Sequence, residues 1–226
     1  YYCGHEYNVV SLAPDKIYSI MIKITLPDGS IKEFEKGATP IMVARSISEG
    51  FARNVISAKF NKTTVETVTP LETDGSLILY TWNDKEGKTA FWHSTSHIVA
   101  QAIEELYPGV KLTIGPAIDN GFYYDIELLD GSISDKDFPA IEKRALEIAR
   151  GKHDYKLRDV SKADALKFYK DQDNEYKVEL IENLEDGTIT FCDHDTFTDL
   201  CRGGHIPNTG IVKAIKILSV AGAYWR

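Results

Sequence analysis

Residues 21–34 read MIKITLPDGSIKEF, and this stretch decides how the first part of the chain folds. Ile22, Ile24 and Leu26 alternate with polar residues, which is the two-residue period of a half-buried strand. Pro27-Asp28-Gly29 then supplies residues that favour a tight turn, and Ile31-Lys32-Glu33-Phe34 forms the returning strand. The pattern predicts a β-hairpin.

A helix and three short strands are predicted after the hairpin. Pro40 opens a stretch in which apolar residues recur at helical spacing. Three strand-like runs follow, at 55–60, 64–68 and 76–81. A hairpin, a helix and short strands in this order are typical of a small β-grasp (ubiquitin-like) module, to which we assign residues 21–82.

Residues 1–20 show no regular pattern. Met21 is a natural start, so we expect residues 1–20 to be a leader or an artificially added extension. They lack a basic start followed by an apolar run, so they do not resemble a secretory signal peptide.

A charged, glycine-containing segment at 83–88 is the predicted domain boundary. Beyond it, residues 83–226 mix helical and strand-like patterns without internal repeats. The predicted helices are 89–107, 137–150 and one that begins after the capping residue Ser161, and the predicted strands are 122–126, 188–192, 195–200 and 213–220. The run 175–180 fits either structure. The fold class is therefore α+β, with a small first domain and a larger second one.

The composition indicates a soluble globular protein without a membrane span. Of 226 residues, 43% are apolar, and no run approaches the length that a bilayer requires. Three widely spaced cysteines do not make a disulfide framework, which favours a reducing compartment. A net charge of −8 argues against a large phosphate-binding surface. It leaves room for a small pocket that receives one end of a nucleic acid.

The most informative chemistry lies in two short motifs. His93 and His97 are four residues apart on the predicted helix 89–107, on the side opposite its main apolar face, so they face a cleft or solvent. Cys201 and His205 are also four apart, with two glycines between them that permit a tight turn. Together the four side chains suit a tetrahedral zinc ion.

A metal-free hydrolytic site fits the same residues. A histidine can hold or deprotonate a water near neutral pH. Lys177 can stabilise negative charge on an ester carbonyl, and Asp199 can hold an ammonium or a hydroxyl group. Cys201 then serves as a steric wall rather than a nucleophile. Chance or structural placement of these residues is the third alternative, and spacing alone does not decide among the three.

Several longer strings resemble the N-terminal part of threonyl-tRNA synthetases, and together they cover nearly everything after Met21. The matching strings are ITLPDGS at 24–30, HSTSH at 93–97, IGPAIDNGFYYD at 114–125, EYKVEL at 175–180, DLCRGGH at 199–205 and AGAYWR at 221–226. The resemblance implies a TGS domain at 21–82 and an editing domain at 83–226. The editing domain would hydrolyse serine mischarged onto threonine tRNA.

The resemblance also implies what the rest of such a protein does. The aminoacylating domain, with its ATP site and its own zinc, would follow Arg226. The editing reaction is implied to need no metal or other cofactor, although zinc on His93, His97, Cys201 and His205 stays an alternative. The partner would be threonine tRNA carrying serine at its 3′ end. We expect a cytoplasmic protein, a monomeric fragment and a homodimeric full-length enzyme.

Residue roles carry over onto the matching positions. The resemblance implies that His93 and His97 position and help activate the water, and that Lys177 contacts the substrate near the scissile ester. Asp199 and His205 would help hold the seryl group, while Cys201 excludes the extra methyl of threonine. The same comparison places Tyr124 and Gly115 beside the terminal adenosine. These lists give catalytic residues His93, His97, Lys177, Cys201 and His205, and substrate-binding residues Asp199, Tyr124 and Gly115.

One position departs from the family pattern. Many relatives have proline before the last histidine, whereas this chain has Gly204, which we expect to loosen the hold on His205. Two other functions stay open: a non-enzymatic module that binds RNA or a partner, and a zinc-dependent freestanding deacylase of another mischarged tRNA. Among the remaining histidines and cysteines, we expect His5, His153 and His194 at the surface and Cys192 in the core, while Cys3 belongs to the extension.

Overall fold

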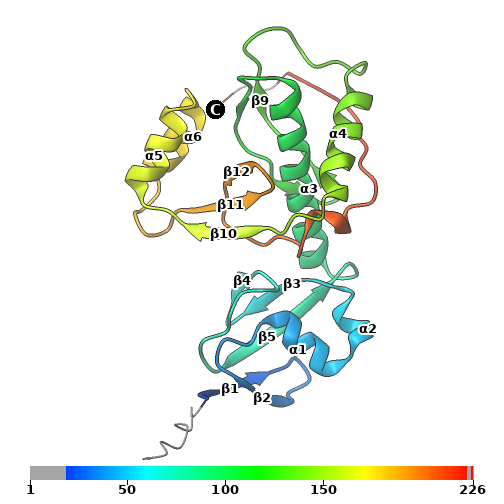
Figure 1. Cartoon of the computed structure of the whole chain (residues 1–226), viewed down its shortest axis with the longest axis vertical. Coiled ribbons are helices and arrows are strands. Elements are labelled where there is room, and N and C mark those ends of the chain that lie inside the picture. The colour runs from blue at the N-terminus through cyan, green and yellow to red at the C-terminus, as the bar shows by residue number, and fades with distance from the viewer. Residues whose placement is uncertain (1–18, 223–224, 226) are drawn as a thin grey trace, which may run out of the picture.

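A five-stranded sheet forms the first lobe of the protein, and a long helix connects it to the second lobe (Figure 1). The structure is a computed structural model that describes residues 19–222 and Trp225. Nearly all of the expected extension at 1–20, including Cys3 and His5, lies outside the described residues.

The first lobe has the β-grasp fold that the sequence predicts. Its strands are β1 (Met21–Thr25), β2 (Ile31–Glu35), β3 (Val55–Phe60), β4 (Thr63–Val65) and β5 (Gly75–Thr81), in the spatial order β2-β1-β5-β3-β4. The predicted hairpin is confirmed, with Ile22 opposite Phe34. Helices α1 (Pro40–Ile47) and α2 (Glu49–Ala52) accompany the sheet, and Val43 packs with Ile24 and Leu77 in the core.

Strand β4 is shorter than predicted. The strand-like run 64–68 leaves the sheet after Val65, because the backbone turns at Glu66, whose carbonyl accepts a hydrogen bond from the Thr69 N–H. Glu66 and Thr67 are nevertheless buried. This turn lies on the side of the first lobe that faces the second lobe.

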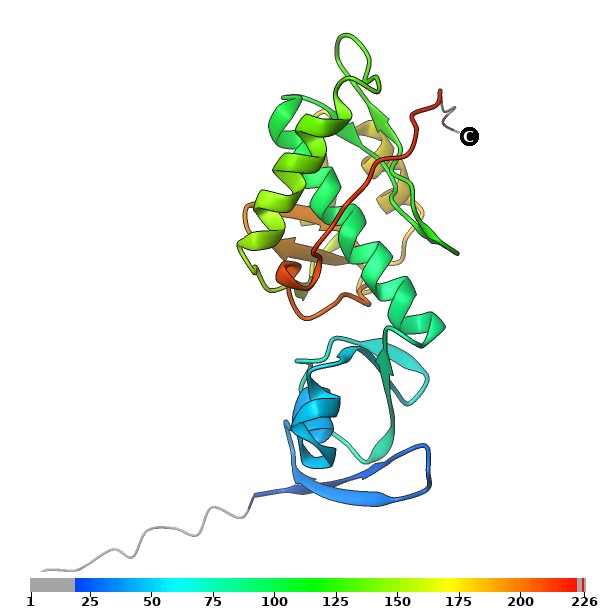
Figure 2. The ribbon, with the colours of Figure 1, turned by 90° about the vertical axis from the view of Figure 1, so that its right-hand side faces the viewer.

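Helix α3 (Lys85–Leu106) starts at the first lobe and runs through the second, as Figure 2 shows. It begins four residues earlier than the predicted helix 89–107. Residues Ser94 to Ile103 are all buried, so the helix is surrounded by protein and has no solvent-facing side along its middle. Helix α4 (Phe138–Arg150) packs against it through Ile141, Ala145 and Ile148.

The rest of the second lobe surrounds these two helices. A three-stranded antiparallel sheet has the order β10-β11-β12, with β10 (Lys156–Asp159), β11 (Thr190–His194) and β12 (Phe197–Leu200). Two small ladders join β6 (Lys111–Leu112) to β9 (Ile126–Glu127) and β7 (Ala117–Ile118) to β8 (Gly121–Phe122). A 3-10 turn, η1, covers Thr209–Ile211.

Two further helices flank the β10-β11-β12 sheet. Ser161 caps α5 (Lys162–Lys170) as predicted, accepting a hydrogen bond from the Asp164 N–H at 3.1 Å. The ambiguous run 175–180 is helical and lies in α6 (Glu175–Glu182). Its cap is Asn174, whose side chain accepts from the Lys177 N–H. This cap holds the backbone of Lys177 in place.

The predicted strand 213–220 is wrong. Between β12 and residue 222, the described chain forms no further strand. Ile215 and Ile217 are half-buried against the core of the second lobe, while Leu218 is 84% exposed. The Ile217 N–H donates to Glu142 of α4. An extended segment that lies along a helix produces the same alternation of apolar residues as a strand, without a ladder partner.

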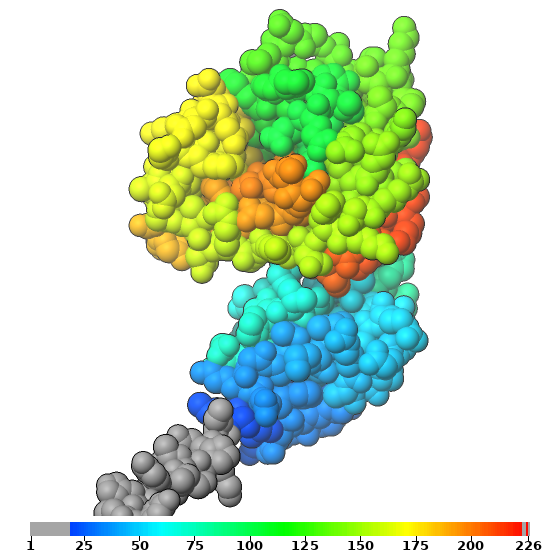
Figure 3. Space-filling model, viewed as in Figure 1, coloured from blue at the N-terminus to red at the C-terminus, as the bar shows by residue number. Residues whose placement is uncertain are grey.

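In the part of the chain that the structure describes, no helix combines the length and the apolar character needed to cross a bilayer. Figure 3 shows that the two lobes touch over a limited part of their facing surfaces.

Candidate active site

A pocket of about 960 Å³ lies where the second lobe meets the first. The second lobe contributes most of its walls, from α3, α6 and the end of β12. The first lobe contributes Ser57 and Thr64. The predicted residues His93, His97, Cys201, Lys177, Asp199, Tyr124 and Gly115 all line this pocket, and His205 lies behind Cys201.

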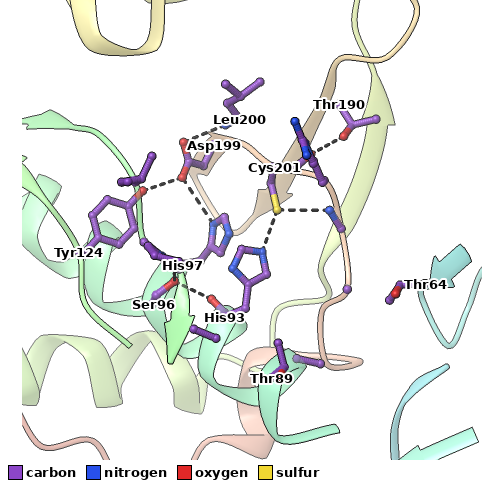
Figure 4. Close-up of a pocket in the computed structure, with 18 of the residues that line it drawn as sticks. Thr64, Thr89, His93, Ser96, His97, Tyr124, Thr190, Asp199, Leu200 and Cys201 are labelled. Atoms are coloured by element: carbon purple, nitrogen blue, oxygen red, sulfur yellow. Dashed lines mark hydrogen bonds and ion pairs between the residues drawn. The ribbon is translucent and has the colours of Figure 1, made fainter. Parts of the chain in front are cut away.

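Four of these side chains converge at one point, and Figure 4 shows His93, His97 and Cys201 among them. The Cys201 Sγ lies 2.9 Å from His93 Nε2 and 3.2 Å from His205 Nε2. One ligating atom from each of these residues and from His97 falls within 4.8 Å of all the others. His97 and His205 are 2% and 0% exposed. The side of α3 that carries the histidines therefore faces the pocket rather than open solvent.

The turn between Cys201 and His205 depends on its two glycines. Gly203 and Gly204 have φ of +89° and +87°, a backbone conformation that residues with a Cβ rarely adopt. Proline, which holds φ near about −65°, cannot occupy position 204 in this conformation. The Gly203 N–H also donates to the Cys201 Sγ, at 3.4 Å. The turn brings the thiol and His205 together.

Asp199 connects the cluster to the opposite wall of the pocket. Its Oδ1 accepts a hydrogen bond from the buried Lys177 ammonium, and its Oδ2 accepts one from the Tyr124 hydroxyl at 2.6 Å. Its Oδ2 also lies 4.0 Å from His97 Nδ1, which has no hydrogen-bond partner. Asp199 and Lys177 are 5% and 2% exposed. Asp199 and Lys177 therefore form a buried ion pair.

Tyr124 and Gly115 lie against each other at the edge of the pocket. A Cβ on Gly115 would approach the Tyr124 ring to 2.2 Å, so only glycine leaves room for the ring. Ser96 Oγ is within hydrogen-bond distance of the carbonyl oxygens of Gly115 and His93, at 2.9 and 2.7 Å. These contacts tie the loop before β7 to helix α3.

The cluster changes the protonation of its members. Burial raises the pKa of the Cys201 thiol, but charge attraction from His205 and hydrogen bonds from the surrounding histidines outweigh it and hold the pKa well below its ordinary value. Burial lowers the pKa of His205, while Cys201 and other neighbours raise it well above its ordinary value. Burial lowers the pKa of His97. These directions favour a neutral His97 and transfer of the Cys201 proton to His205.

Comparison of the sequence with known proteins shows which proteins this chain resembles. A family described as "TGS domain" matches residues 22–81, and one described as "Threonyl and Alanyl tRNA synthetase second additional domain" matches residues 188–223. A threonine–tRNA ligase of Flavobacterium johnsoniae is 75% identical over 206 residues, or 91% of this chain. The chain is similar to the N-terminal third of threonine–tRNA ligases. Threonine–tRNA ligases of Cytophaga hutchinsonii and Porphyromonas gingivalis are each 54% identical over the same share of the chain.

The chain spans about a third of the length of these synthetases, 32% in each of the three cases. The second family match includes the Cys201-to-His205 turn, and it excludes helix α3 with His93 and His97. The structure brings the two motifs together.

Several residues around this pocket are missing from the sequence-based set. The hydroxyl of Tyr169 in α5 accepts a hydrogen bond from the Leu200 N–H and donates one to Asp199 Oδ1, at 3.3 Å. Tyr155 stacks on the His205 ring with centroids 5.0 Å apart. Tyr169 follows Ala165 at helical spacing, which is a signal for burial but not for function. No sequence pattern near Tyr155 or Glu66 indicates that either residue lies at the site.

His194 was expected at the surface, and this expectation is wrong. The side chain is 2% exposed, and it packs among Tyr155, His97 and Phe197. Neither ring nitrogen has a hydrogen-bond partner. It sits at the end of β11, where the alternation of the strand directs it into the core. Cys192, two residues earlier on the same face, is buried as expected.

The four convergent residues have a donor set that fits zinc. One thiolate and three imidazoles are a known tetrahedral ligand set, and ligating atoms around such an ion lie about 3.5 Å apart. The observed limit of 4.8 Å comes close to this spacing. His93, His97, Cys201 and His205 would hold the ion. With all four bound the site would be closed, and hydrolysis by a metal-bound water would require one of them to leave.

Proposed function

We propose that this pocket hydrolyses serine mischarged onto threonine tRNA. The observation that carries the proposal is the convergence of His93, His97, Cys201 and His205 in one pocket of a chain 75% identical to a threonine–tRNA ligase. The volume of about 960 Å³ suits the end of a tRNA, since small-molecule sites measure roughly 300–1,000 Å³. The substrate would enter as a terminal adenosine esterified to serine.

In this proposal His97 acts on the water. Because burial keeps its ring neutral, it can accept a proton as the water oxygen attacks the ester carbonyl. His93, half-buried and in contact with Cys201, positions the same water. The carbon–oxygen bond to the ribose then breaks, and the ribose oxygen takes up the proton. The products are serine and uncharged tRNA.

Charged residues at the opposite wall bind the substrate. Lys177 lies beside the developing negative charge on the carbonyl oxygen, and Asp199 holds the seryl group. His205, predicted to share that role, acts from behind Cys201, which forms the pocket wall. Tyr124 and Gly115 flank the terminal adenosine. These roles use the pocket walls as they stand, since Asp199 is already oriented by Lys177 and Tyr124.

Selectivity against threonine follows from the size of the pocket near Cys201. A missing methyl gives a synthesis site only about 1–3 kcal/mol of discrimination, so serine enters a site made for threonine. A second site that admits serine and excludes the larger residue supplies the missing fidelity. Cys201, 6% exposed at the pocket wall, is the residue that we propose meets the extra methyl.

The whole protein is proposed to be a threonine–tRNA ligase that charges its tRNA with ATP in the cytoplasm. The present chain corresponds to the first third of such enzymes. ATP binding, the structural zinc of the synthetase and homodimer formation are assigned to the region beyond the match. The proposed partner of the pocket is threonine tRNA.

The test is deacylation of Ser-tRNA(Thr) and Thr-tRNA(Thr) by the chain, with and without a chelator. We expect selective loss of serine that survives chelation. His97→Ala should slow the reaction by about a hundredfold or more, since a general base contributes at least that much. His153→Ala is the matched control, because that histidine pairs with Asp195 outside the pocket. No hydrolysis by the unaltered chain would contradict the proposal and favour an RNA-binding module.

The zinc ligand set favours one second candidate, a zinc-dependent deacylase. It predicts that the purified chain contains close to one zinc per molecule and that a chelator abolishes hydrolysis. Activity on a different mischarged tRNA, with Ser-tRNA(Thr) untouched, would point to this candidate rather than to synthetase editing.

A further inference from the structure

Glu66 brings a carboxylate of the first lobe into the site of the second lobe. It follows strand β4 and is 7% exposed. Its Oε1 lies 3.0 Å from the Gly204 N and 3.0 Å from His205 Nδ1, and its Oε2 lies 3.0 Å from the His205 N. Two backbone N–H groups and one ring nitrogen therefore point at a single carboxylate.

We propose that Glu66 is a positioning residue of the editing site, which the β-grasp lobe supplies to fix the Gly203–His205 turn and the orientation of the His205 ring. The proposal deepens the proposed function and rests on it for its effect on hydrolysis. Its effect on the ring can be measured independently.

The turn needs an external partner because it has little preference of its own. Gly203 and Gly204 are free to adopt many backbone conformations, so the sequence of the turn does not hold its shape. A buried N–H group that lacks an acceptor destabilises the fold. Glu66 accepts from two of these groups, and a Cβ on Gly204 would lie only 3.3 Å from the Thr64 side chain. The first lobe thus shapes this turn.

Glu66 also determines which of two flipped orientations the His205 ring takes. The Tyr155 ring stacks on the His205 ring, with centroids 5.0 Å apart and 7° between the planes. The His93 ring also stacks on the His205 ring, with centroids 4.9 Å apart and 24° between the planes. Stacking holds the plane of a ring, but it does not distinguish the ring from its flipped form. A carboxylate at Nδ1 does, because only a nitrogen can donate to it. With Nδ1 at Glu66, Nε2 points at Cys201.

The consequence reaches the reacting side of the pocket. His205 Nε2 contacts Cys201, and Cys201 contacts His93. A flipped or displaced His205 ring would remove the contact between His205 and Cys201 and shift the wall that we assign to methyl exclusion. Glu66 acts through His205 and touches no substrate.

Glu66→Gln is the sharpest substitution, because it keeps the size of the side chain. Both carboxylate oxygens accept hydrogen bonds, so the amide nitrogen must face at least one N–H group that has no other acceptor. Glu66→Asp keeps two acceptor oxygens at a shorter reach. Glu72→Gln is the matched control, because Glu72 is an exposed acid of the same lobe that pairs with Lys36.

The experiment measures three quantities for each variant: kcat and KM for Ser-tRNA(Thr), the thermal unfolding midpoint, and the ¹⁵N resonances of the His205 ring. We expect Glu66→Gln to lower kcat by about 10- to 100-fold, as for other oriented histidines, with KM changed less than threefold. The proton at Nδ1 should be lost or redistributed in the ring spectrum. Glu66→Asp should recover part of kcat, and Glu72→Gln should match the unaltered chain.

A folded Glu66→Gln variant with unchanged kcat and an unchanged ring spectrum would overturn the inference. If the unaltered chain hydrolyses nothing, the proposed function fails, and the ring spectrum alone then decides for or against Glu66. If Glu66→Gln does not fold, Glu66→Ala takes its place, and an unaltered His205 spectrum in that variant would count against the inference.

Discussion

Asp199 illustrates how one residue serves both stability and function. Its carboxylate accepts from Lys177 and Tyr124 inside the protein, and it also borders the pocket. Removing one member of a buried ion pair leaves the other charge without a partner, which costs about 3–5 kcal/mol. The geometry that prepares the pocket is therefore held by an interaction that the fold itself depends on.

For Asp199→Asn we expect the free energy of unfolding to fall by about 3–5 kcal/mol, because the buried Lys177 ammonium loses its carboxylate. Denaturant titration gives the value. Asp171→Asn is the control, since the Asp171–Lys167 pair is exposed and should contribute less than about 1 kcal/mol. An equal loss of unfolding free energy in the two variants would show that the Asp199–Lys177 pair contributes no more to stability than an exposed pair.

His194 makes stability depend on pH. Burial, with the neighbouring histidines, lowers its pKa to about 3, whereas in the unfolded chain the pKa is about 6.5. The unfolded state therefore binds a proton first as the pH falls, and stability decreases from about pH 6.5 down to about pH 3. At pH 4.5 the contribution is a loss of about 2–3 kcal/mol relative to pH 8.

The comparison that isolates this effect is unfolding of the unaltered chain and of His194→Phe across that pH range. We expect the variant to gain on the unaltered chain steadily as the pH drops below 6.5. Two curves that stay parallel from pH 8 to pH 4 would mean that His194 titrates alike in both states.

At the scale of single residues, sequence reasoning found the side chains whose contacts are local. His93 and His97 are one helical turn apart, and Cys201 and His205 share a glycine turn, so spacing alone indicates that each pair converges. Glu66 is 139 residues from His205, and nothing near it in the sequence announces that contact. His194 was placed at the surface for a similar reason, since its burial depends on Tyr155 and Phe197.

Among the elements, helix α3 carries the connection between the lobes, and its first turn lies tightly against the end of β5. Gly87 is buried there, and a Cβ on it would lie 1.9 Å from the Thr81 carbonyl oxygen. The backbone of α3 can approach the strand this closely only because position 87 has no side chain.

Gly87→Ala is expected to lower the free energy of unfolding by about 1–3 kcal/mol, because the strand or the helix must move to admit the methyl group. Gly50→Ala is the matched control in α2, where a Cβ would meet nothing closer than 4.0 Å. That variant should be neutral or stabilised by up to about 1 kcal/mol. A Gly87→Ala variant as stable as the control would show that the junction yields easily.

Elements were predictable where periodicity and end signals agreed. The hairpin and the helix capped by Ser161 are examples, since each combines an apolar pattern with a turn or capping residue. Helix α4 was predictable from its apolar spacing alone. The run 175–180 was undecided because its period is ambiguous, although Asn174 is a capping residue that favours a helix. The segment 213–220 was misassigned because packing along α4 imitates the alternation of a strand.

At the scale of the whole molecule, we expect the present chain to be a monomer in solution. The proposed dimer contacts of the synthetase belong to the region outside the match, and a net charge of −8 disfavours self-association. Sedimentation equilibrium should give a mass near 25.3 kDa. A mass of twice that value at micromolar concentration would contradict the expectation, and a mass that rises with added salt would show that charge repulsion keeps the copies apart.

The contact between Glu66 and His205 also has a consequence in time. A chain is synthesised from its N-terminus at about 5–20 residues per second, so the 139 residues between the two partners correspond to roughly 7 to 28 s. Through that interval the β-grasp lobe can fold while its carboxylate remains hydrated. The glycine turn is synthesised after the first lobe and can meet a surface that has already folded. The folded first lobe is then in place to bind the turn as the chain leaves the ribosome. The order of synthesis therefore favours the correct shape of the site.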